Sequence, residues 1–239
     1  MKILTIRLTS PLQSYGDEAT FERRTTGDYP SKSSIIGMIA AALGYSREDP
    51  RISQLNDLNF AVRIDQAGQM LTDFHTVEWK KNVRKITYRD YIQNAVFVVA
   101  VGSNDDQQIT KIHNALRHPH YQLFLGRRAN VPAGVLLMEE LDDKNPVTVL
   151  ENLGWQVSPW SQKVYRKQNP GKMFPKVDIY ADANLLNDHH SVMVKDRVGS
   201  FDQRNRYFGY RAMSTERVQL TYSCIAVDES TEHDALSAL

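Results

Sequence analysis

Apolar and polar side chains alternate over residues 1–8, MKILTIRL, so that one face of this segment is apolar. The period of two predicts a β-strand with one buried face, and Pro11 ends it. A second strand is predicted over Leu58–Ile64, which also alternates. Ala95–Val101 is continuously apolar and predicts a central strand, and a short strand is predicted over Tyr121–Leu125.

Two amphipathic helices separate these strands. The first is predicted between Ser31 or Ser33, either of which can cap it, and Gly44, which suits a left-handed C-terminal cap. The second is capped by Asp105 or Asp106 and carries apolar residues at helical spacing. The resulting order is strand, helix, strand, excursion, strand, helix, strand. That order is the ferredoxin-like pattern, which is also the scaffold of RNA-recognition modules.

The excursion, Glu78–Tyr91, is too polar for a core, and its apolar residues are interleaved with charge. We interpret it as a protruding hairpin. After Pro132, short apolar runs recur between turn residues without a strong helical period. The predicted fold class is therefore α+β. It comprises a ferredoxin-like (RRM-type) domain over 1–132 with a hairpin at about 77–91, and a β-rich region over 133–239 with a basic loop at 163–176 and an acidic tail.

Composition excludes several classes of protein. The chain of 239 residues is 41% hydrophobic and 24% charged, which suffices to bury a core. No apolar run approaches the roughly 20 residues that span a bilayer, and the first residues do not form a signal peptide. Cys224 is the single cysteine, so an intramolecular disulfide is excluded. We expect a cytoplasmic protein with no membrane partner.

The net charge of +1 does not indicate a nucleic-acid-binding protein, but the distribution of charge does. Eight carboxylates fall in two segments, 139–143 and 228–234, and the rest of the chain is basic. Three basic clusters result: Lys80, Lys81, Arg84, Lys85 and Arg89; Arg127 and Arg128; and Lys163, Arg166, Lys167, Lys172 and Lys176. Solvated charged faces are the alternative interpretation of each cluster.

The polar loop between the first strand and the first helix carries candidate RNA-binding groups. Gln13, Ser14 and Tyr15 offer an amide for a base edge and a ring for stacking, although an ordinary turn explains them too. Arg23, Arg24, Thr25 and Thr26 supply donors for phosphates.

The start of the first helix is a second candidate. Lys32, Ser33 and Ser34 lie where free N–H groups and the helix dipole favour an anion, and simple capping is compatible with that role. There is no GxxxxGK[ST] motif, so nucleotide hydrolysis is unsupported.

The hairpin combines its basic cluster with Trp79 and Tyr88, as single-strand binders do, although these rings could instead pack on a neighbouring subunit. Arg127 and Arg128 follow Gly126, and a glycine there allows close backbone approach to a phosphate. The alternative for this pair is a charged turn.

Four segments together resemble a known family: SPLQSYG, TTGDYPSKSSIIGMIAAALG, FHTV and YQLFLGRR, in this order over the first half of the chain. They are similar to the CasD-type members of the Cas-five family (RAMP superfamily), which cap the 5′ handle of crRNA in type I-E CRISPR Cascade, an antiviral ribonucleoprotein complex. The resemblance implies a thumb-like hairpin and includes His75, in FHTV, among the RNA-binding residues. It also implies a non-catalytic subunit, because a separate endonuclease, CasE, cuts the RNA.

The partners implied by this resemblance are crRNA, the CasC backbone subunit and the CasA large subunit, with target DNA contacted only through the complex. No cofactor is expected. A scaffold that binds only proteins remains an alternative.

The histidines leave one enzymatic alternative open. His113, His118 and His120 lie around the end of the second helix, and an imidazole base could activate a 2′-hydroxyl without metal. Such a site would make the chain a crRNA-processing endoribonuclease of the type I-C kind. Packing of His113 at the edge of the core is the competing interpretation. Asp188 with His189 and His190 is a poor metal site, because adjacent residues rarely point at one ion, so no metal is expected.

Overall fold

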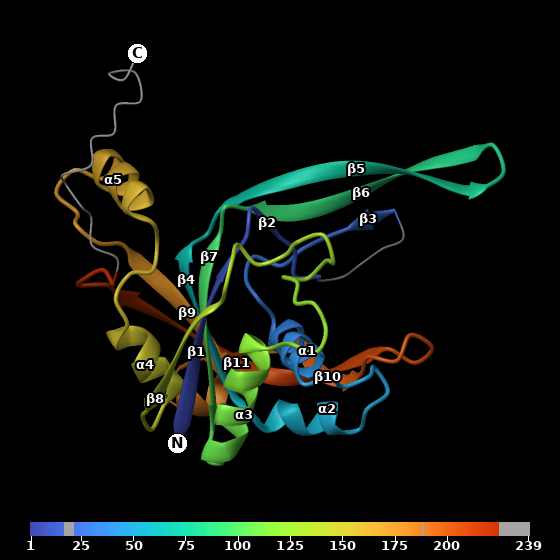
Figure 1. The fold of residues 1–239 in the computed structure, drawn as a ribbon. Coiled ribbons are helices and arrows are strands. Elements are labelled where there is room, and N and C mark those ends of the chain that lie inside the picture. The colour runs from blue at the N-terminus through green and yellow to red at the C-terminus, as the bar shows by residue number, and fades with distance from the viewer. Residues whose placement is uncertain (17–21, 188, 225–239) are drawn as a thin grey trace.

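The structure is a computed structural model that describes residues 1–16, 22–187 and 189–224. Within these residues, seven strands form one antiparallel sheet at the centre of the molecule (Figure 1). In chain order they are β1 (Lys2–Thr9), β4 (Asn59–Gln66), β7 (Val96–Ser103), β8 (Leu137–Asp142), β9 (Lys176–Asp182), β10 (Ser191–Ser200) and β11 (Tyr207–Gln219). Across the sheet the order is β10-β11-β9-β4-β7-β1-β8.

Two helices cover one face of the middle strands. α1 (Lys32–Ala42) connects β1 to β4, and α3 (Asp106–Arg117) connects β7 to β8. Both helices pack on the apolar side chains of β1 in one core cluster. Ser31 caps α1, Gly44 follows it with a φ of 76°, and Asp105 caps α3. The two predicted strand–helix–strand units are therefore present and the α+β class is confirmed, while the name ferredoxin-like stays our interpretation of this connectivity.

The predicted strand at Tyr121–Leu125 is wrong. The fourth strand of the pattern is β8, and the preceding segment runs as irregular chain along the end of α1, where the Tyr121 N–H donates to the Ala41 carbonyl at 3.2 Å. Its alternation serves to bury Leu123 and Leu125 beside the helices, without a strand partner.

The prediction that only one face of β1 is buried is also wrong. A third helix, α4 (Pro146–Asn152), covers the opposite face of the sheet, where Ile3 is fully buried with Val147 and Leu150. Arg63 on β4 is buried on this side as well, and its guanidinium pairs with Asp65 at 2.6 Å. The middle of the sheet is thus covered on both faces.

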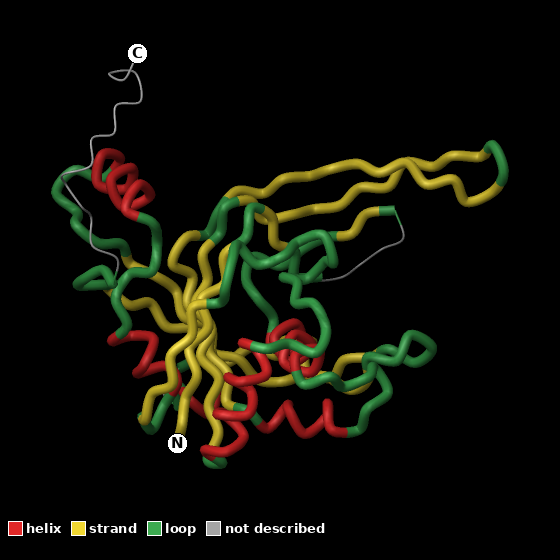
Figure 2. Tube along the Cα trace, viewed as in Figure 1, coloured by secondary structure: helices red, strands yellow, loops and turns green. Residues whose placement is uncertain are grey.

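The polar excursion is a long hairpin that leaves the body of the molecule (Figure 2). β5 (Gln69–Lys80) and β6 (Val83–Gln93) pair along their length and turn at Asn82, which has a φ of 61°. The hairpin therefore begins eight residues before the predicted start at Val77. Two short strands, β2 (Leu12–Gln13) and β3 (Arg23–Arg24), pair with β6 at the base of the hairpin.

The second half of the chain contains helices that the pattern did not predict. Besides α4, α5 (Pro159–Gln168) occupies most of the segment interpreted as a basic loop. Strands from both sides of the predicted boundary at 132 and 133 lie in the same sheet. The remaining short elements are α2 (Arg51–Gln54) and the 3-10 turns Leu55–Asp57 and Ala183–Leu185. The acidic tail after Val227 lies outside the described residues. Among those that are described, no helix is long and apolar enough to cross a membrane.

Candidate nucleic-acid interface

Five arginines from three separate segments gather at the base of the hairpin. β3 pairs in parallel with β6, which sets Arg23 opposite Tyr88 and Arg24 opposite Arg89. The loop after Gly126 meets the same place. We call this group the arginine cluster: Arg23, Arg24, Arg89, Arg127 and Arg128.

Gly126 fixes the position of the loop that carries two of these arginines. Its φ is 91°, which side chains rarely adopt, and a Cβ there would lie 1.4 Å from the Ser14 carbonyl oxygen. The Ser14 N–H donates to the Leu125 carbonyl at 3.2 Å and joins the two backbones. The sequence predicts that Gly126 allows the backbone to approach a phosphate, whereas the group that approaches it in the structure is the backbone of Ser14.

The Arg127 side chain ties this loop to both other segments. Its guanidinium lies 4.4 Å from the ring centroid of Tyr91, a residue of β6 that is itself buried. One Nη of Arg127 donates to the Arg24 carbonyl at 2.9 Å. Arg128 is exposed beside it. The cluster is thus held by backbone pairing, a cation–π contact and a hydrogen bond.

The charge of the cluster is only partly neutralised. The Asp90 carboxylate accepts from Arg23 at 3.2 and 3.4 Å and from the Thr72 hydroxyl at 2.7 Å. These hydrogen bonds, first from Thr72 and then from Arg23, hold the pKa of Asp90 below its ordinary value. Over the described part of the chain, Arg24, Arg89, Arg127 and Arg128 form no ion pair. Four cations therefore remain for an anionic ligand.

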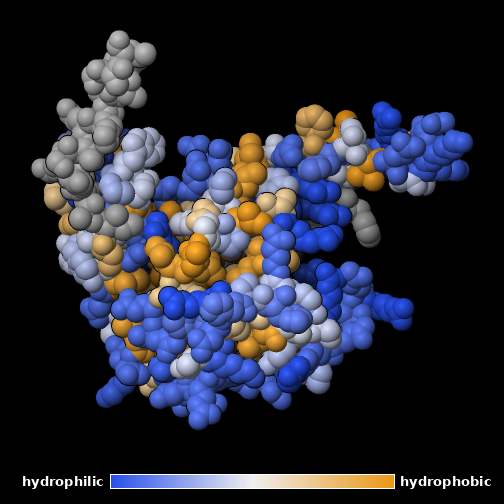
Figure 3. Space-filling model, in the orientation of Figure 1, coloured by the Kyte–Doolittle hydropathy of each residue, from blue (hydrophilic) through white to orange (hydrophobic). Residues whose placement is uncertain are grey.

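Apolar and aromatic side chains lie exposed along the hairpin above this cluster (Figure 3). Phe74 and Tyr88 are cross-strand partners and are 64% and 48% exposed. Trp79 near the tip is 68% exposed, and Lys80, Lys81 and Arg84 surround the turn. A two-stranded hairpin has no core of its own, so these rings are available for stacking or for a partner surface.

Two further hairpin residues of the predicted site, Lys85 and His75, each lie against a carboxylate. Lys85 pairs with Glu22, next to β3. The Nε2 of His75 lies 3.1 Å from a carboxylate oxygen of Asp73. The charge of Lys85 is therefore shared with a carboxylate, whereas the contact of His75 is with a residue of its own strand.

Gln13, Ser14 and Tyr15 do not face a ligand. They are at most 3% exposed, and Gln13 donates to the Ala95 carbonyl at 2.9 Å while accepting from the Tyr15 hydroxyl at 2.6 Å. Thr26 is buried too, and its hydroxyl accepts a hydrogen bond from the Tyr15 N–H at 2.7 Å. The amide and ring are satisfied internally, which corrects their interpretation as base-reading groups.

The N-terminus of α1 binds an anion that belongs to the protein itself. The Lys32 N–H donates to the Asp196 carboxylate of β10 at 2.9 Å, and the Lys32 ammonium pairs with Asp182 at 3.0 Å. Ser33 and Ser34 form hydrogen bonds with the cap residue Ser31. The N-terminus of α1 binds an anion, as its dipole favours, but that anion is a carboxylate of the protein, so Lys32, Ser33 and Ser34 are not part of the proposed site.

The three candidate catalytic histidines have separate environments. His113 Nδ1 lies 2.5 Å from Glu140, which also pairs with Lys2 at 2.8 Å. His118 ends α3 and is exposed, and the His120 ring packs edge-on against Tyr121. Among the described contacts, none joins two of these histidines.

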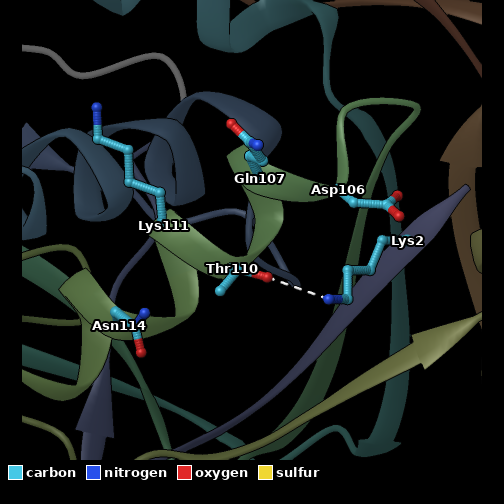
Figure 4. Close-up of a pocket in the computed structure, with 6 residues that line it drawn as sticks. All are labelled: Lys2, Asp106, Gln107, Thr110, Lys111 and Asn114. Carbon is cyan, nitrogen blue, oxygen red and sulfur yellow. Dashed lines mark hydrogen bonds between the residues drawn. The ribbon is translucent and has the colours of Figure 1, made fainter.

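A shallow cavity of about 570 Å³ lies on the exposed side of α3 (Figure 4). It is lined by six polar or charged side chains, and the Lys2 ammonium donates to the Thr110 hydroxyl at 3.1 Å. None of the six described side chains that line the cavity is aromatic, so none can stack on a base. No group of three His, Cys, Asp or Glu that could hold a metal is found in residues 1–16, 22–187 and 189–224, and Asp188 falls outside them.

Sequence reasoning missed two residues that position the cluster. Tyr91 supports Arg127, and Asp90 binds Arg23. The alternation of β6 was the available signal, because it sets Tyr91 on the same face as Arg89. The partner segments are distant in sequence and could not be predicted from that pattern.

Comparison with known proteins finds similarity to CRISPR-associated proteins at the level of both sequence and structure. The sequence model of a family described as CRISPR-associated protein (Cas_Cas5) matches residues 3–214. The CRISPR system Cascade subunit CasD of Escherichia coli (strain K12) is 32% identical over 147 residues, which are 53% of this chain. The match covers 65% of that relative, just under two thirds of its length.

Two solved structures resemble the whole fold. One is described as a CRISPR RNA-guided surveillance complex; its chain has a TM-score of 0.73 and 28% identity, with coverage of 91% of this chain and 90% of that one. The other, described as a Cas protein, has a TM-score of 0.68 and 25% identity, with coverage of 94% and 99%.

Proposed function

Because the chain belongs to the Cas5 family of CRISPR-associated proteins, we propose that it is the subunit of a type I-E Cascade complex that holds the 5′ handle of crRNA without cutting it. The arginine cluster is the observation that carries this proposal. Four of its guanidinium groups have no ion pair within the described residues, and the hairpin that carries Arg89 also exposes the rings of Phe74 and Tyr88. Cations beside stacking platforms are typical of sites for single-stranded RNA.

The two parts of the site have different roles in this proposal. Arg24, Arg89, Arg127 and Arg128 bind phosphates, because guanidinium groups donate paired hydrogen bonds to phosphate oxygens. Phe74 and Tyr88 stack on bases that are splayed away from their neighbours. The hairpin would then order the RNA where it leaves the cluster.

The proposed partners are crRNA, the CasC backbone subunit and the CasA large subunit. The similarity to a Cascade subunit and to a chain of a surveillance complex supports an assembly of this kind. The exposed apolar side chains of the hairpin support it as well, since Trp79 and Ile86 lack a cover within the described chain. Contact with target DNA would be made only through the assembled complex, and the proposed location is the cytoplasm.

A second candidate function rests on His113. The contact between its Nδ1 and Glu140 is the arrangement by which a carboxylate orients an imidazole base. Such a base would support cleavage of RNA without metal. His118 and His120 have other contacts and do not complete a catalytic group, so we favour the binding function.

One experiment separates the two candidates. The purified chain is incubated with end-labelled repeat RNA in EDTA, and binding and RNA integrity are followed together. The proposal requires intact RNA whose affinity falls steeply with salt, because phosphate contacts release counterions. Cleavage at one position that is lost in His113→Ala would establish the endoribonuclease instead. Binding that is insensitive to salt and to charge reversal at Arg127 and Arg128 would favour a protein scaffold.

A further inference from the structure

The helix α5 presents a basic surface on the side of the molecule opposite the hairpin. Figure 1 places both at the same end of the central sheet, with α5 beyond β4 and β9 and the hairpin leaving in the other direction. Trp155, just before α5, donates from its indole N–H to the Asp65 carbonyl near the end of β4 at 3.0 Å. The proposed handle site does not include this surface.

The inner face of α5 is anchored to the body of the protein. Gln162 is fully buried and donates to the Val157 carbonyl at 3.2 Å and to the Ser223 hydroxyl at 2.7 Å. The Tyr165 ring packs edge-on against Trp155, with centroids 5.3 Å apart. Ser158 caps the helix by accepting from the Ser161 N–H. These contacts hold the helix in a fixed orientation. They therefore determine which of its side chains face the solvent.

The outer face of α5 combines an exposed ring with cations. Trp160 is 73% exposed, and Lys163 and Lys167 follow at spacings of three and four residues, which places all three side chains on one face. Lys172 and Lys176 continue the basic surface beyond the helix. We call Trp160, Lys163, Lys167, Lys172 and Lys176 the α5 surface.

The sequence segment that carries the α5 surface contains no acidic residue. Asp and Glu are absent from residues 152–177 of the sequence. In the described chain, none of the four lysines of the α5 surface forms an ion pair. Favourable interaction with the helix dipole explains cations in the last turn of α5. It does not explain Lys172 and Lys176 beyond the helix, or an indole left in water at its start.

We propose that the α5 surface is a second binding site for single-stranded nucleic acid, separate from the arginine cluster. The lysines would follow successive phosphates, and Trp160 would stack on one base. Lysines at helical spacing lie about 5–6 Å apart at their Cβ atoms, so the ammonium groups of Lys163 and Lys167 can reach different phosphates of one strand. A ring beside cations binds single strands of any sequence, because every base has a stacking face.

Tryptophan fluorescence can test this site in the full-length chain. The probe is a 12-nucleotide oligodeoxythymidine, added to the variant Trp79→Phe, in which Trp160 is the remaining exposed indole because Trp155 is only 3% exposed. We expect the oligonucleotide to quench the fluorescence of this variant and not that of Trp79→Phe/Trp160→Phe. Equal quenching in both variants would overturn the proposal.

Charge reversal provides an independent readout by anisotropy of the labelled oligonucleotide. Measured in the background Arg127→Glu/Arg128→Glu, the pair Lys163→Glu/Lys167→Glu should weaken binding at least tenfold and reduce the salt slope by about 1.4, at ~0.7 per phosphate contact. The control Lys111→Glu/Lys144→Glu changes net charge equally on exposed residues elsewhere. If both pairs behave alike, or the first has no effect, the α5 surface is not a nucleic-acid site and faces a protein instead. Should Lys163→Glu/Lys167→Glu fail to fold, Lys163→Gln/Lys167→Gln decides by the same criteria.

Discussion

The guanidinium of Arg127 stacks over the ring of Tyr91 with 4.4 Å between its central carbon and the ring centroid. This contact joins a loop to the base of a hairpin 36 residues earlier in the chain, by the difference of the two residue numbers. Arg127 also donates to the Arg24 carbonyl. One side chain therefore connects the three segments that form the arginine cluster, and it has a positioning role besides any contact with RNA.

Substitutions of Arg127 should separate its role in positioning the cluster from the contribution of its charge to RNA binding. Arg127→Ala should weaken binding of the handle RNA more than Arg128→Ala does, because it removes a phosphate donor and also the contacts to Tyr91 and Arg24. Arg127→Lys should recover part of the salt slope, since it keeps the charge, but not the full affinity, since a lysine lacks the planar fork. Filter binding over a range of salt concentrations measures both quantities. Equal effects of Arg127→Ala and Arg128→Ala would contradict the positioning role.

Gly126 offers a matched pair of substitutions. Gly126→Ala should destabilise the fold and weaken RNA binding, because its Cβ would overlap the Ser14 carbonyl and shift the loop. Gly134→Ala is the control, since Gly134 has a similar φ of 88° and open space around it. The control should cost only about 1 kcal/mol for the left-handed conformation. Thermal unfolding and RNA affinity are the measurements, and similar behaviour of the two variants would argue against the close approach.

Asp196 tests how the N-terminus of α1 is stabilised. Its carboxylate accepts from the Lys32 N–H and forms paired hydrogen bonds with Arg211 at 2.7 and 3.0 Å. Asp196→Ala should lower the free energy of unfolding by roughly 2–3 kcal/mol, because it leaves buried donors without a partner. Asp178→Ala breaks a similar pair with Arg217, whose side chain is 67% exposed, and should cost less than about 1 kcal/mol. Urea denaturation compares the two variants.

The pH dependence of the cluster follows from Asp90. Its pKa is lowered in the folded protein, so the stability it contributes is present above the ordinary pKa of an aspartate, about 3.9, and is lost as the pH falls through the lower folded value. The stability of the hairpin base should therefore be constant between pH 6 and 8 and fall only under acid conditions. Asp90→Asn should be less stable than the wild type at pH 7, and the difference should shrink at acid pH. A difference that grows on acidification would contradict this assignment.

The first half of the fold was largely predictable from sequence because its signals are local. Strand alternation near the N-terminus, the cap at Ser31 and the cap at Asp105 each depend on neighbouring residues. The second half contained local signals that were misinterpreted. The interpretation of 133–239 as β-rich leaves out Pro146 and Pro159, each of which opens a helix directly after a capping residue, Asn145 and Ser158.

The candidate site was predictable only in part. Whether a polar side chain is free to bind RNA depends on its contacts with residues that are distant in the sequence. Gln13 and Tyr15 have the chemistry of base-reading groups, but the partner of Gln13, the Ala95 carbonyl, lies 82 residues away. The sequence predicts a phosphate as the partner of Lys32, whereas its partners in the structure are carboxylates on β9 and β10. Arg127 and Arg128 stayed in the proposed site because a glycine and a turn keep them at the surface.

A hydrogen-exchange footprint of handle RNA on the whole chain tests the central claim most directly. Amide exchange is measured with and without the RNA, and peptides are compared along the sequence. The proposed function predicts protection concentrated in residues 22–24, 85–92 and 124–130, the three segments of the arginine cluster. It further predicts that this protection disappears in Arg127→Glu/Arg128→Glu. Protection confined to other segments, such as 111–120 around the histidines, would contradict the account.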